Sequence, residues 1–352
     1  MEHEIWTCTK DPGGTRGLMP VVKQLRSRGL PVRLIADKAA VQGVLDMLEG
    51  YEVLSTPEEA LKDGAPKVLI TTMCSGGGVG RDLAKVLAGQ TCQVVALQDY
   101  WGGALTDEWA GVRPDYICVN DLFGKEITCK SWPDFDTKKV IITGYPALDR
   151  FAGRDIRVLA VEAREKLALP TDMPIVLFGG VLQSTGHAMS ELVEVLNELD
   201  QPVCFIPRLH PRMAQAPEDK TLCDTAIGLF HNGQVIADSS ACGVEALIAA
   251  ATVTITPFST MLLEASVMRK PNISLFYEPQ AEFYENSTGG MIKEFPTVTL
   301  GCSAKAINRV ELAATVRSAL AGTLALEEAQ KSNFVLDGGN ARRVAHFAVN
   351  LL

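Results

Sequence analysis

A repeated unit of apolar strand, polar turn and amphipathic helix constrains this chain most strongly. EIWTC leads into GGTRGLMPVVKQLRSRG, where Leu18, Val21 and Val22 recur at helical spacing. PVRLIA, YEVL, KVLITT, CQVVALQD, DYICVN and KVIITGYP follow as further strands. Because helices between successive buried strands act as crossover connections, the pattern predicts an α/β fold with right-handed, parallel, doubly wound sheets.

The alternation restarts after a helix expected over 155–168. MPIVLFGG, QPVCFIPRLHP, GQVIADS, TVTITP and KPNISLFY are the expected strands of this second set. We therefore predict two Rossmann-like domains, residues 1–150 and 151–335. Ligands of open α/β sheets lie beyond the carboxyl ends of the strands, so the strand-to-helix loops are the expected functional regions. Further helices are expected over 39–49, near 188–199, near 308–320 and near 338–350.

Composition limits the class of protein. The net charge of −9 over 352 residues argues against binding to nucleic-acid phosphates. The sequence has no apolar run of 18 or more residues, and its start, MEHEIWTCTKDPGG, lacks the regions of a signal peptide. Nine scattered cysteines without a CxxC pair suggest reduced thiols in a cytoplasmic protein.

Three loops of the first half are candidates for ligand binding. KDPGGTRG, with Gly13 and Gly14, either lets the backbone approach a ligand or forms a simple tight turn. TTMCSGGGVGRD gives room for a substrate or is a flexible turn, and it lacks the Gly-Lys-Ser/Thr ending of a P-loop. In LQDYWGGALTDEW, Gln98 and Asp99 suit a sugar-hydroxyl binder and a general base, whereas Asp107 can serve as a helix cap.

Two loops of the second half are typical of anion sites. The glycines, amides and hydroxyls of FGGVLQSTGH form a phosphate cradle at a helix N-terminus. Two arginines and a histidine in PRLHPR could together hold a diphosphate, although a lone histidine is more often structural. The candidate residues in these loops are Gly179, Gly180, Ser184, Thr185, Arg208, His210 and Arg212.

The segment TPFSTMLLEAS places a carboxylate inside an apolar helix. Ser259 and Thr260 stand at the helix start, where they satisfy its first amides or a ligand's oxygens. Glu264 lies one turn further on, too far along to be a cap. It is either a salt-bridged carboxylate or an acceptor for two vicinal ribose hydroxyls, and its chemistry alone leaves both open.

ITGYPALDRF, PRLHPR and TPFSTMLLEASVMRKP together resemble the GT-B superfamily of nucleotide-sugar glycosyltransferases, UDP-N-acetylglucosamine 2-epimerases and glycerophosphotransferases. The resemblance implies two Rossmann-like domains facing across a cleft, with the helix of residues 336–352 returning to the first. It implies that Glu264 holds the nucleotide ribose and that Ser259, Thr260, Gly180, Ser184 and Thr185 line the diphosphate. His210 matches a histidine of the epimerases.

The resemblance favours a glycosyltransferase that moves a sugar from a UDP-linked or other nucleotide-diphosphate donor to an acceptor held by the first domain. Asp99 would be the base, and neither a metal nor another cofactor is expected. LQDYWGG replaces an epimerase motif, and Leu263 precedes Glu264 where epimerases have paired glutamates, which counts against epimerase activity. A UDP-N-acetylglucosamine 2-epimerase, a hydrolase and a non-catalytic sugar-nucleotide binder are the alternatives; the choice between monomer and homodimer is open.

Overall fold

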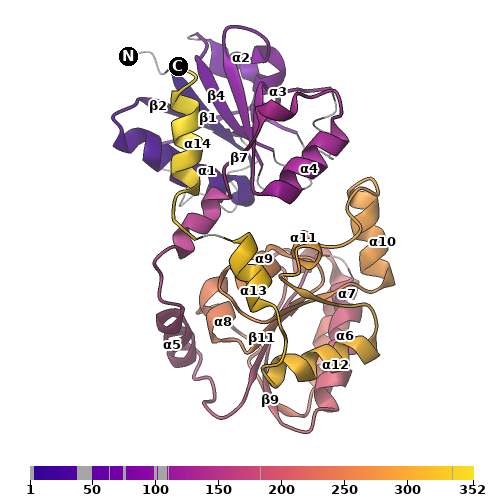
Figure 1. The fold of residues 1–352 in the computed structure, drawn as a ribbon. Coiled ribbons are helices and arrows are strands. Elements are labelled where there is room, and N and C mark those ends of the chain that lie inside the picture. The colour runs from indigo at the N-terminus through magenta and orange to yellow at the C-terminus, as the bar shows by residue number, and fades with distance from the viewer. Residues whose placement is uncertain are drawn as a thin grey trace. The chain divides into compact units, whose positions relative to one another are not determined.

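The computed structural model describes residues 4–37, 50–62, 64–73, 77–98, 101, 109, 111–182, 184–334 and 336–352. The chain divides into two compact units, each built on its own sheet (Figure 1). Unit 1 comprises Met1–Ala152 and Leu336–Leu352, and unit 2 comprises Gly153–Val335. The helix expected over 39–49 lies outside the described residues.

Unit 1 contains a parallel sheet with the strand order β3-β2-β1-β4-β5-β6-β7 among the described residues. The order reverses between β1 and β4, which makes their carboxyl ends the switch point where ligands bind in such sheets. The strands are β1 (Ile5–Thr9), β2 (Val32–Asp37), β3 (Glu52–Leu54), β4 (Val68–Thr72), β5 (Gln93–Leu97), β6 (Tyr116–Val119) and β7 (Val140–Ile142).

Helices cover both faces of this sheet, because alternate strand residues point to opposite sides. Ile5 of β1 packs with α1 and α14, whereas Trp6 and Cys8 pack on the face covered by α3. The helical segments are α1 (Pro12–Ser27), α2 (Pro57–Leu61), α3 (Val79–Leu87), α4 (Leu122–Ser131), α14 (Asn340–Val349) and the 3-10 turns η5 (Thr137–Lys139) and η6 (Pro146–Phe151).

The segment TGYPALD, residues 143–149, is the docking site of α14 within unit 1. Both Asp149 carboxylate oxygens accept backbone amides of the helix start, from Asn340 at 3.1 Å and Ala341 at 2.8 Å. The Asn340 side chain donates to the Tyr145 carbonyl at 3.1 Å. Gly144 has a φ of 80°, and a Cβ there would overlap Asn340 Oδ1. The motif therefore fixes the chain's last helix to the sheet.

We expect Asp149→Ala to lower the free energy of unfolding by about 1–2 kcal/mol, because it removes a charged cap from two helix amides. Chemical denaturation monitored by circular dichroism measures the loss. Asp136→Ala is the matched control, since exposed Asp136 caps a single amide, that of Lys138, at the short turn η5. Equal losses in the two variants would contradict the role assigned to Asp149.

Unit 2 repeats the architecture with the order β10-β9-β8-β11-β12-β13 among its described residues, again parallel and again reversed beside its first strand. Val176 and Phe178 of β8 pack under α6, α7 and α12. The strands are β8 (Ile175–Gly179), β9 (Val203–Arg208), β10 (Gly233–Val235), β11 (Val253–Thr256), β12 (Asn272–Leu275) and β13 (Ala304–Ala306). The helices are α5 (Ile156–Lys166), α6 (Thr185–Asn197), α7 (Pro217–Leu229), α8 (Val244–Ala250), α9 (Thr260–Val267), α10 (Glu278–Ser287), α11 (Pro296–Thr299), α12 (Arg309–Leu320) and α13 (Glu327–Asn333), with the 3-10 turn η7 (Met213–Gln215).

Some element bounds differ from those the sequence predicts. Helix α6 begins at Thr185 rather than near residue 188, because the carboxylate of Asp219 in α7 accepts the Gly186 amide at 2.9 Å and supports the polar first turn. The strand GQVIADS ends at Val235, where its pairing with β9 stops. The edge strand β13 has no long apolar run and is defined by its pairing with β12.

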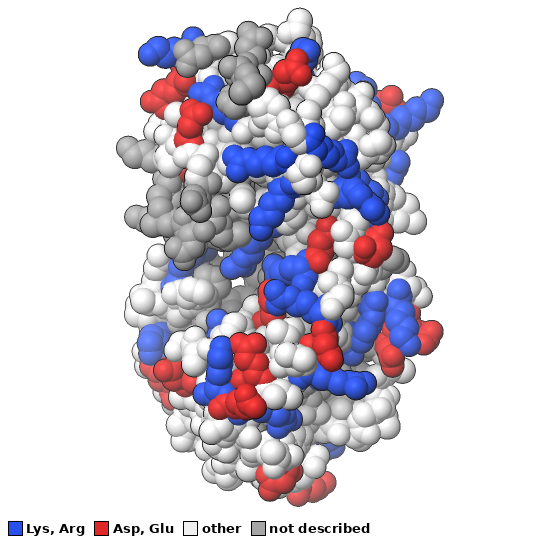
Figure 2. All heavy atoms as spheres, turned by 90° about the vertical axis from the view of Figure 1, so that its left-hand side faces the viewer, with Lys and Arg blue, Asp and Glu red and all other residues white. Residues whose placement is uncertain are grey.

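Surface charge is unevenly distributed. Helices α1 and α14 carry no Asp or Glu, and they hold Arg16, Lys23, Arg26, Arg342 and Arg343. Figure 2, which views the side on which these helices lie in Figure 1, shows Lys and Arg grouped over unit 1. This face is therefore cationic although the chain is acidic overall. None of the described helices combines the length and the apolar character that a membrane span needs.

Candidate functional site

Three loops of unit 2 meet at the carboxyl ends of β8, β9 and β11, beside the switch point of the sheet. The Gly180 amide donates to the Arg208 carbonyl at 2.8 Å. A Cβ on Gly180 would lie 3.2 Å from the backbone nitrogen of His210, and one on Gly179 would lie 2.5 Å from Met261 Sδ. Both glycines are therefore required by close packing of the loops, which brings the predicted residues of all three together.

The loop between β8 and α6 is held by its own side chains. The Thr185 hydroxyl is buried, accepts the Val181 amide at 2.9 Å and donates back to the Val181 carbonyl. Its hydroxyl hydrogen is thus used within the loop and is not offered to a ligand. Ser184 has a φ of 57°, and its carbonyl accepts the Gln280 side chain at 3.0 Å. The predicted diphosphate contact of Ser184 stays a prediction.

Arg208 lies half-buried at the end of β9, with its guanidinium beside the loop that precedes α8. Its Nη1 is 3.3–3.5 Å from the Cys242 carbonyl and from two oxygens of Ser239. These are long contacts from one nitrogen to neutral acceptors. No carboxylate among the described residues pairs with Arg208, in contrast to Arg154, which pairs with Glu245 at 3.2 Å. Its charge is therefore available to an anion.

The imidazole of His210 is fixed by the loop that it belongs to. The backbone amide of Arg212 donates to His210 Nδ1 at 3.1 Å. A backbone amide can only donate, so the hydrogen of the neutral ring is on Nε2. Burial, reinforced by the positive charge of Arg212, lowers the pKa of His210 below its usual 6.5. At neutral pH His210 is thus an uncharged donor through Nε2.

Helix α9 places its polar residues as the sequence predicts. Ser259 is the N-cap, and its Oγ accepts the Met261 amide at 3.3 Å. Thr260 is exposed at the first helical position. Glu264 lies one turn inside and is only 7% exposed among apolar neighbours of the same helix. Its carboxylate oxygens can accept hydrogen bonds, so Glu264 is an acidic candidate contact at this edge.

Two further polar groups lie at this edge and are absent from the sequence prediction. The Thr256 hydroxyl, at the end of β11, is fully buried and makes no hydrogen bond. Gln280 of α10 is also buried, and its Oε1 has no partner. Thr256 could be predicted from the sequence, because it stands at the end of an expected strand. The position of Gln280 could not, because it depends on how α10 packs.

The predicted residues of unit 1 are less open to a ligand. Gly13 and Gly14 lie in the first turn of α1 rather than in a loop, and the Asp11 carboxylate accepts the Gly14 amide at 2.8 Å. Gln98 is buried and donates to the Trp101 carbonyl at 3.2 Å, while its Oε1 has no partner. Asp99, the predicted base, lies outside the described residues, as does Asp107.

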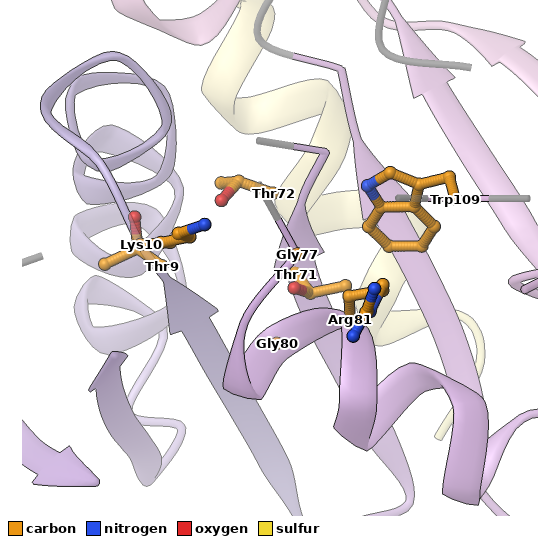
Figure 3. Close-up of a pocket in the computed structure, with 8 residues that line it drawn as sticks. All are labelled: Thr9, Lys10, Thr71, Thr72, Gly77, Gly80, Arg81 and Trp109. Carbon is orange, nitrogen blue, oxygen red and sulfur yellow. The ribbon is translucent and has the colours of Figure 1, made fainter. Parts of the chain in front are cut away.

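A small pocket with a volume of about 10 Å³ opens at the switch point of unit 1, between the carboxyl ends of β1 and β4 (Figure 3). Its lining consists of three threonines, two glycines, Lys10, Arg81 and Trp109. This pocket was not predicted as a unit, although Lys10 and Arg81 belong to the two glycine-rich loops that the sequence singles out.

Several solved structures have the same fold as this protein over almost the full length of the chain. The UDP-GlcNAc 2-epimerase from Neisseria meningitidis bound to UDP-GlcNAc has a TM-score of 0.68 and 12% identity, over 98% of this chain and 99% of that one. A glycosyltransferase from Rickettsia africae has a TM-score of 0.64 and 13% identity, over 99% of both chains. The wall teichoic acid polymerase TagF has a TM-score of 0.60 and 11% identity, over 99% of this chain and 89% of that one. These similarities confirm the predicted α/β fold of the GT-B type.

Comparison with curated proteins finds no match. A family model gives a more specific result than the solved structures do. The model described as CDP-Glycerol:Poly(glycerophosphate) glycerophosphotransferase matches residues 106–348, about two thirds of the chain. The matched range includes the loops with Arg208, His210 and Glu264. This chain is a transferase with the GT-B fold, and it belongs to the CDP-glycerol:poly(glycerophosphate) glycerophosphotransferase family.

Proposed function

We propose that this transferase binds a nucleoside-diphosphate-linked donor in unit 2 and passes the linked group to an acceptor bound by unit 1. The observation that carries the proposal is the convergence of three loops at Gly179 and Gly180. At the sheet's switch point it gathers Arg208, which pairs with no carboxylate among the described residues, the neutral donor His210 and the buried Glu264. Such an edge suits an anionic nucleotide.

Each side chain has a role that follows from its environment. Glu264, in the second turn of α9, accepts the two ribose hydroxyls through its carboxylate oxygens. Arg208 and the Nε2 hydrogen of His210 stabilise the charge that develops on the departing phosphate. Because the hydrogen of neutral His210 is on Nε2, this nitrogen does not act as a base. The base for the acceptor hydroxyl remains the predicted Asp99.

The donor we favour is CDP-glycerol, because the family description names it. In that reaction the acceptor oxygen attacks the phosphorus next to glycerol, the bond from this phosphorus to the bridging oxygen breaks, and CMP leaves. A UDP-linked sugar is the second candidate, supported by full-length similarity to an epimerase bound to UDP-GlcNAc. There the acceptor oxygen attacks the sugar carbon, and UDP leaves. In both reactions the hydroxyl proton passes to the base.

The released nucleotide tests these alternatives directly. The chain is incubated with CDP-glycerol or a UDP-sugar, with and without an acceptor, and the products are separated by ion-exchange chromatography. Release of CMP that requires the acceptor supports glycerophosphate transfer, and release of UDP that requires it supports sugar transfer. Release without an acceptor indicates a hydrolase, and an isomeric nucleotide sugar indicates an epimerase. Tight binding without turnover would contradict the proposal and indicate a binding protein.

We expect Glu264→Gln and Glu264→Ala to weaken CDP or UDP binding by about 1.5–3 kcal/mol, because hydrogen bonds to a charged acceptor are lost. Calorimetry measures the change, and circular dichroism checks the fold. Glu282→Ala is the control, since this glutamate is exposed on α10. The decisive comparison uses 2′-deoxynucleotides: they should bind more weakly than ribonucleotides to the wild type and almost equally to Glu264→Gln. If Glu264→Gln keeps the wild-type preference for ribonucleotides, Glu264 has a structural role and does not bind the ribose.

A further inference from the structure

Helix α10 carries a hydrogen-bond acceptor that the protein leaves unused. Gln280 is fully buried, and its Nε2 donates to the Ser184 carbonyl at 3.0 Å. A carbonyl oxygen can only accept, so the nitrogen of the side-chain amide faces Ser184 and Oε1 is the other atom. Oε1 makes no hydrogen bond. Because a buried acceptor without a partner is unfavourable, this position favours a ligand that supplies a donor.

The contacts of Gln280 place this acceptor at the candidate donor edge of unit 2. Ser184 is the N-cap of α6 and ends the loop that follows Gly179. Thr256 lies at the other end of this loop, since a Cβ on Gly179 would be 3.3 Å from the Thr256 Cβ. The Thr256 hydroxyl is also buried without a hydrogen bond. Two unused oxygens therefore flank the loop that is predicted to line the diphosphate.

Aromatic contacts hold α10 against a second loop of the site. Phe283 of α10 stacks on Phe258, with ring centroids 5.6 Å apart and an angle of 20° between the planes. Phe258 directly precedes Ser259, the N-cap of α9. Helix α10 thus contacts the loops after β8 and β11. Because Oε1 is covered in this structure, a ligand reaches it through a small outward shift of α10, of the kind that many binding sites undergo.

The chemistry of Oε1 limits which part of the proposed donor it contacts. Phosphate oxygens are acceptors and cannot donate to another acceptor. The ribose hydroxyls are assigned to Glu264 of α9, whereas Gln280 belongs to α10, which follows the next strand, β12. A hydroxyl of the group linked to the diphosphate and an amino group of the base are the remaining donors. The bond from Gln280 to the diphosphate loop favours the hydroxyl.

We propose that Gln280 is a specificity-determining residue for the group that the donor carries, because its Oε1 accepts a hydrogen bond from a hydroxyl of that group. The inference rests on the proposed function, and it names the residue that selects the transferred group. A group with a hydroxyl at this position satisfies the buried acceptor, whereas its deoxy analogue leaves the acceptor unpaired. Sites with such buried polar groups discriminate strongly against analogues that lack the hydroxyl.

The test compares the affinities of CDP, CDP-glycerol and the two CDP-propanediols that each lack one glycerol hydroxyl, measured by calorimetry with the full chain. We expect the wild type to bind CDP-glycerol about 10-fold more tightly than one of the propanediols. Gln280→Met removes the acceptor at similar side-chain length, so it should bind CDP-glycerol and that analogue equally and leave CDP affinity unchanged. If UDP binds instead of CDP, UDP-GlcNAc and its monodeoxy analogues form the corresponding series.

Gln280→Glu separates the acceptor from the contact with Ser184. This variant keeps an acceptor oxygen and loses the donor to the Ser184 carbonyl, so it should still discriminate although its charge weakens every nucleotide. Gln330→Met is the control, because Gln330 is also buried in unit 2 but its amide donates to the carbonyls of Lys270 and Cys302. Circular dichroism checks the fold of each variant.

Unchanged discrimination in Gln280→Met would overturn the assignment and leave the donor site intact, which is the result expected if water satisfies Oε1. Equal losses of affinity for CDP and CDP-glycerol in this variant would place Gln280 at the nucleotide and also overturn it. Loss of discrimination in Gln280→Glu would show that the Ser184 contact is responsible rather than the acceptor. A wild-type chain that binds neither CDP nor UDP would contradict the proposed function itself, and the inference with it.

Discussion

Replacing His210 by leucine is expected to lower turnover by about 10²–10³-fold, because it removes the donor that we propose stabilises the charge of the departing phosphate. The ring is held by the Arg212 amide through Nδ1, so Nε2–H is the hydrogen available to a substrate. His210→Gln should recover part of the loss, since its side-chain amide places a donor close to the position of Nε2. Steady-state rates with saturating donor measure both variants. Wild-type turnover in His210→Leu would eliminate this role.

The pH profile provides an independent readout of the same assignment. Protonation of His210 puts a hydrogen on Nδ1 and breaks its bond from the Arg212 amide, which releases the ring. Burial and the charge of Arg212 lower the pKa of His210, so activity should persist at pH 6.5 and fall only as the pH drops through the lowered value. Arg212→Met removes the repelling charge and should move this midpoint upward. A midpoint that does not move would contradict the coupling.

The sequence predicts the strands of the fold most clearly where both faces of a strand are buried. All residues of β1, β4 and β8 are buried, so each strand is a continuous run of mainly apolar residues. Edge elements lack that signal, and β13 is a strand only because β12 pairs with it. Helix α6 begins earlier than its apolar pattern because Asp219, 33 residues away, caps it. Such tertiary partners are not encoded in local periodicity.

The sequence locates the candidate site by loop position, but it does not show which groups face a ligand. The loops after β8, β9 and β11 are identifiable because carboxyl ends of parallel strands meet at one edge. Within them, Thr185 resembles a ligand contact in the sequence, yet its hydroxyl bonds to Val181. Conversely, Thr256 is not among the predicted site residues, yet its buried hydroxyl at the end of β11 makes no hydrogen bond. Hydrogen-bond partners, rather than residue types, decide these roles.

Arg208→Met should lower turnover by about 10²–10³-fold with a smaller effect on nucleotide affinity, because charge on the departing phosphate is greatest in the transition state. Arg208 has no carboxylate partner among the described residues of unit 2, and its Nη1 makes only long contacts to Ser239 and Cys242. Its charge can therefore neutralise a phosphate without a metal ion, and activity should survive a chelator.

Arg208→Lys keeps the charge but not the planar pair of donors, so it should recover only part of the rate lost in Arg208→Met. Arg157→Met is the control, because Arg157 is exposed on α5. The measurement is acceptor-dependent release of CMP or UDP under saturating donor, with and without EDTA. Full activity of Arg208→Met would remove Arg208 from the mechanism. Loss of wild-type activity in EDTA would instead show that a cation carries the charge that Arg208 is expected to neutralise.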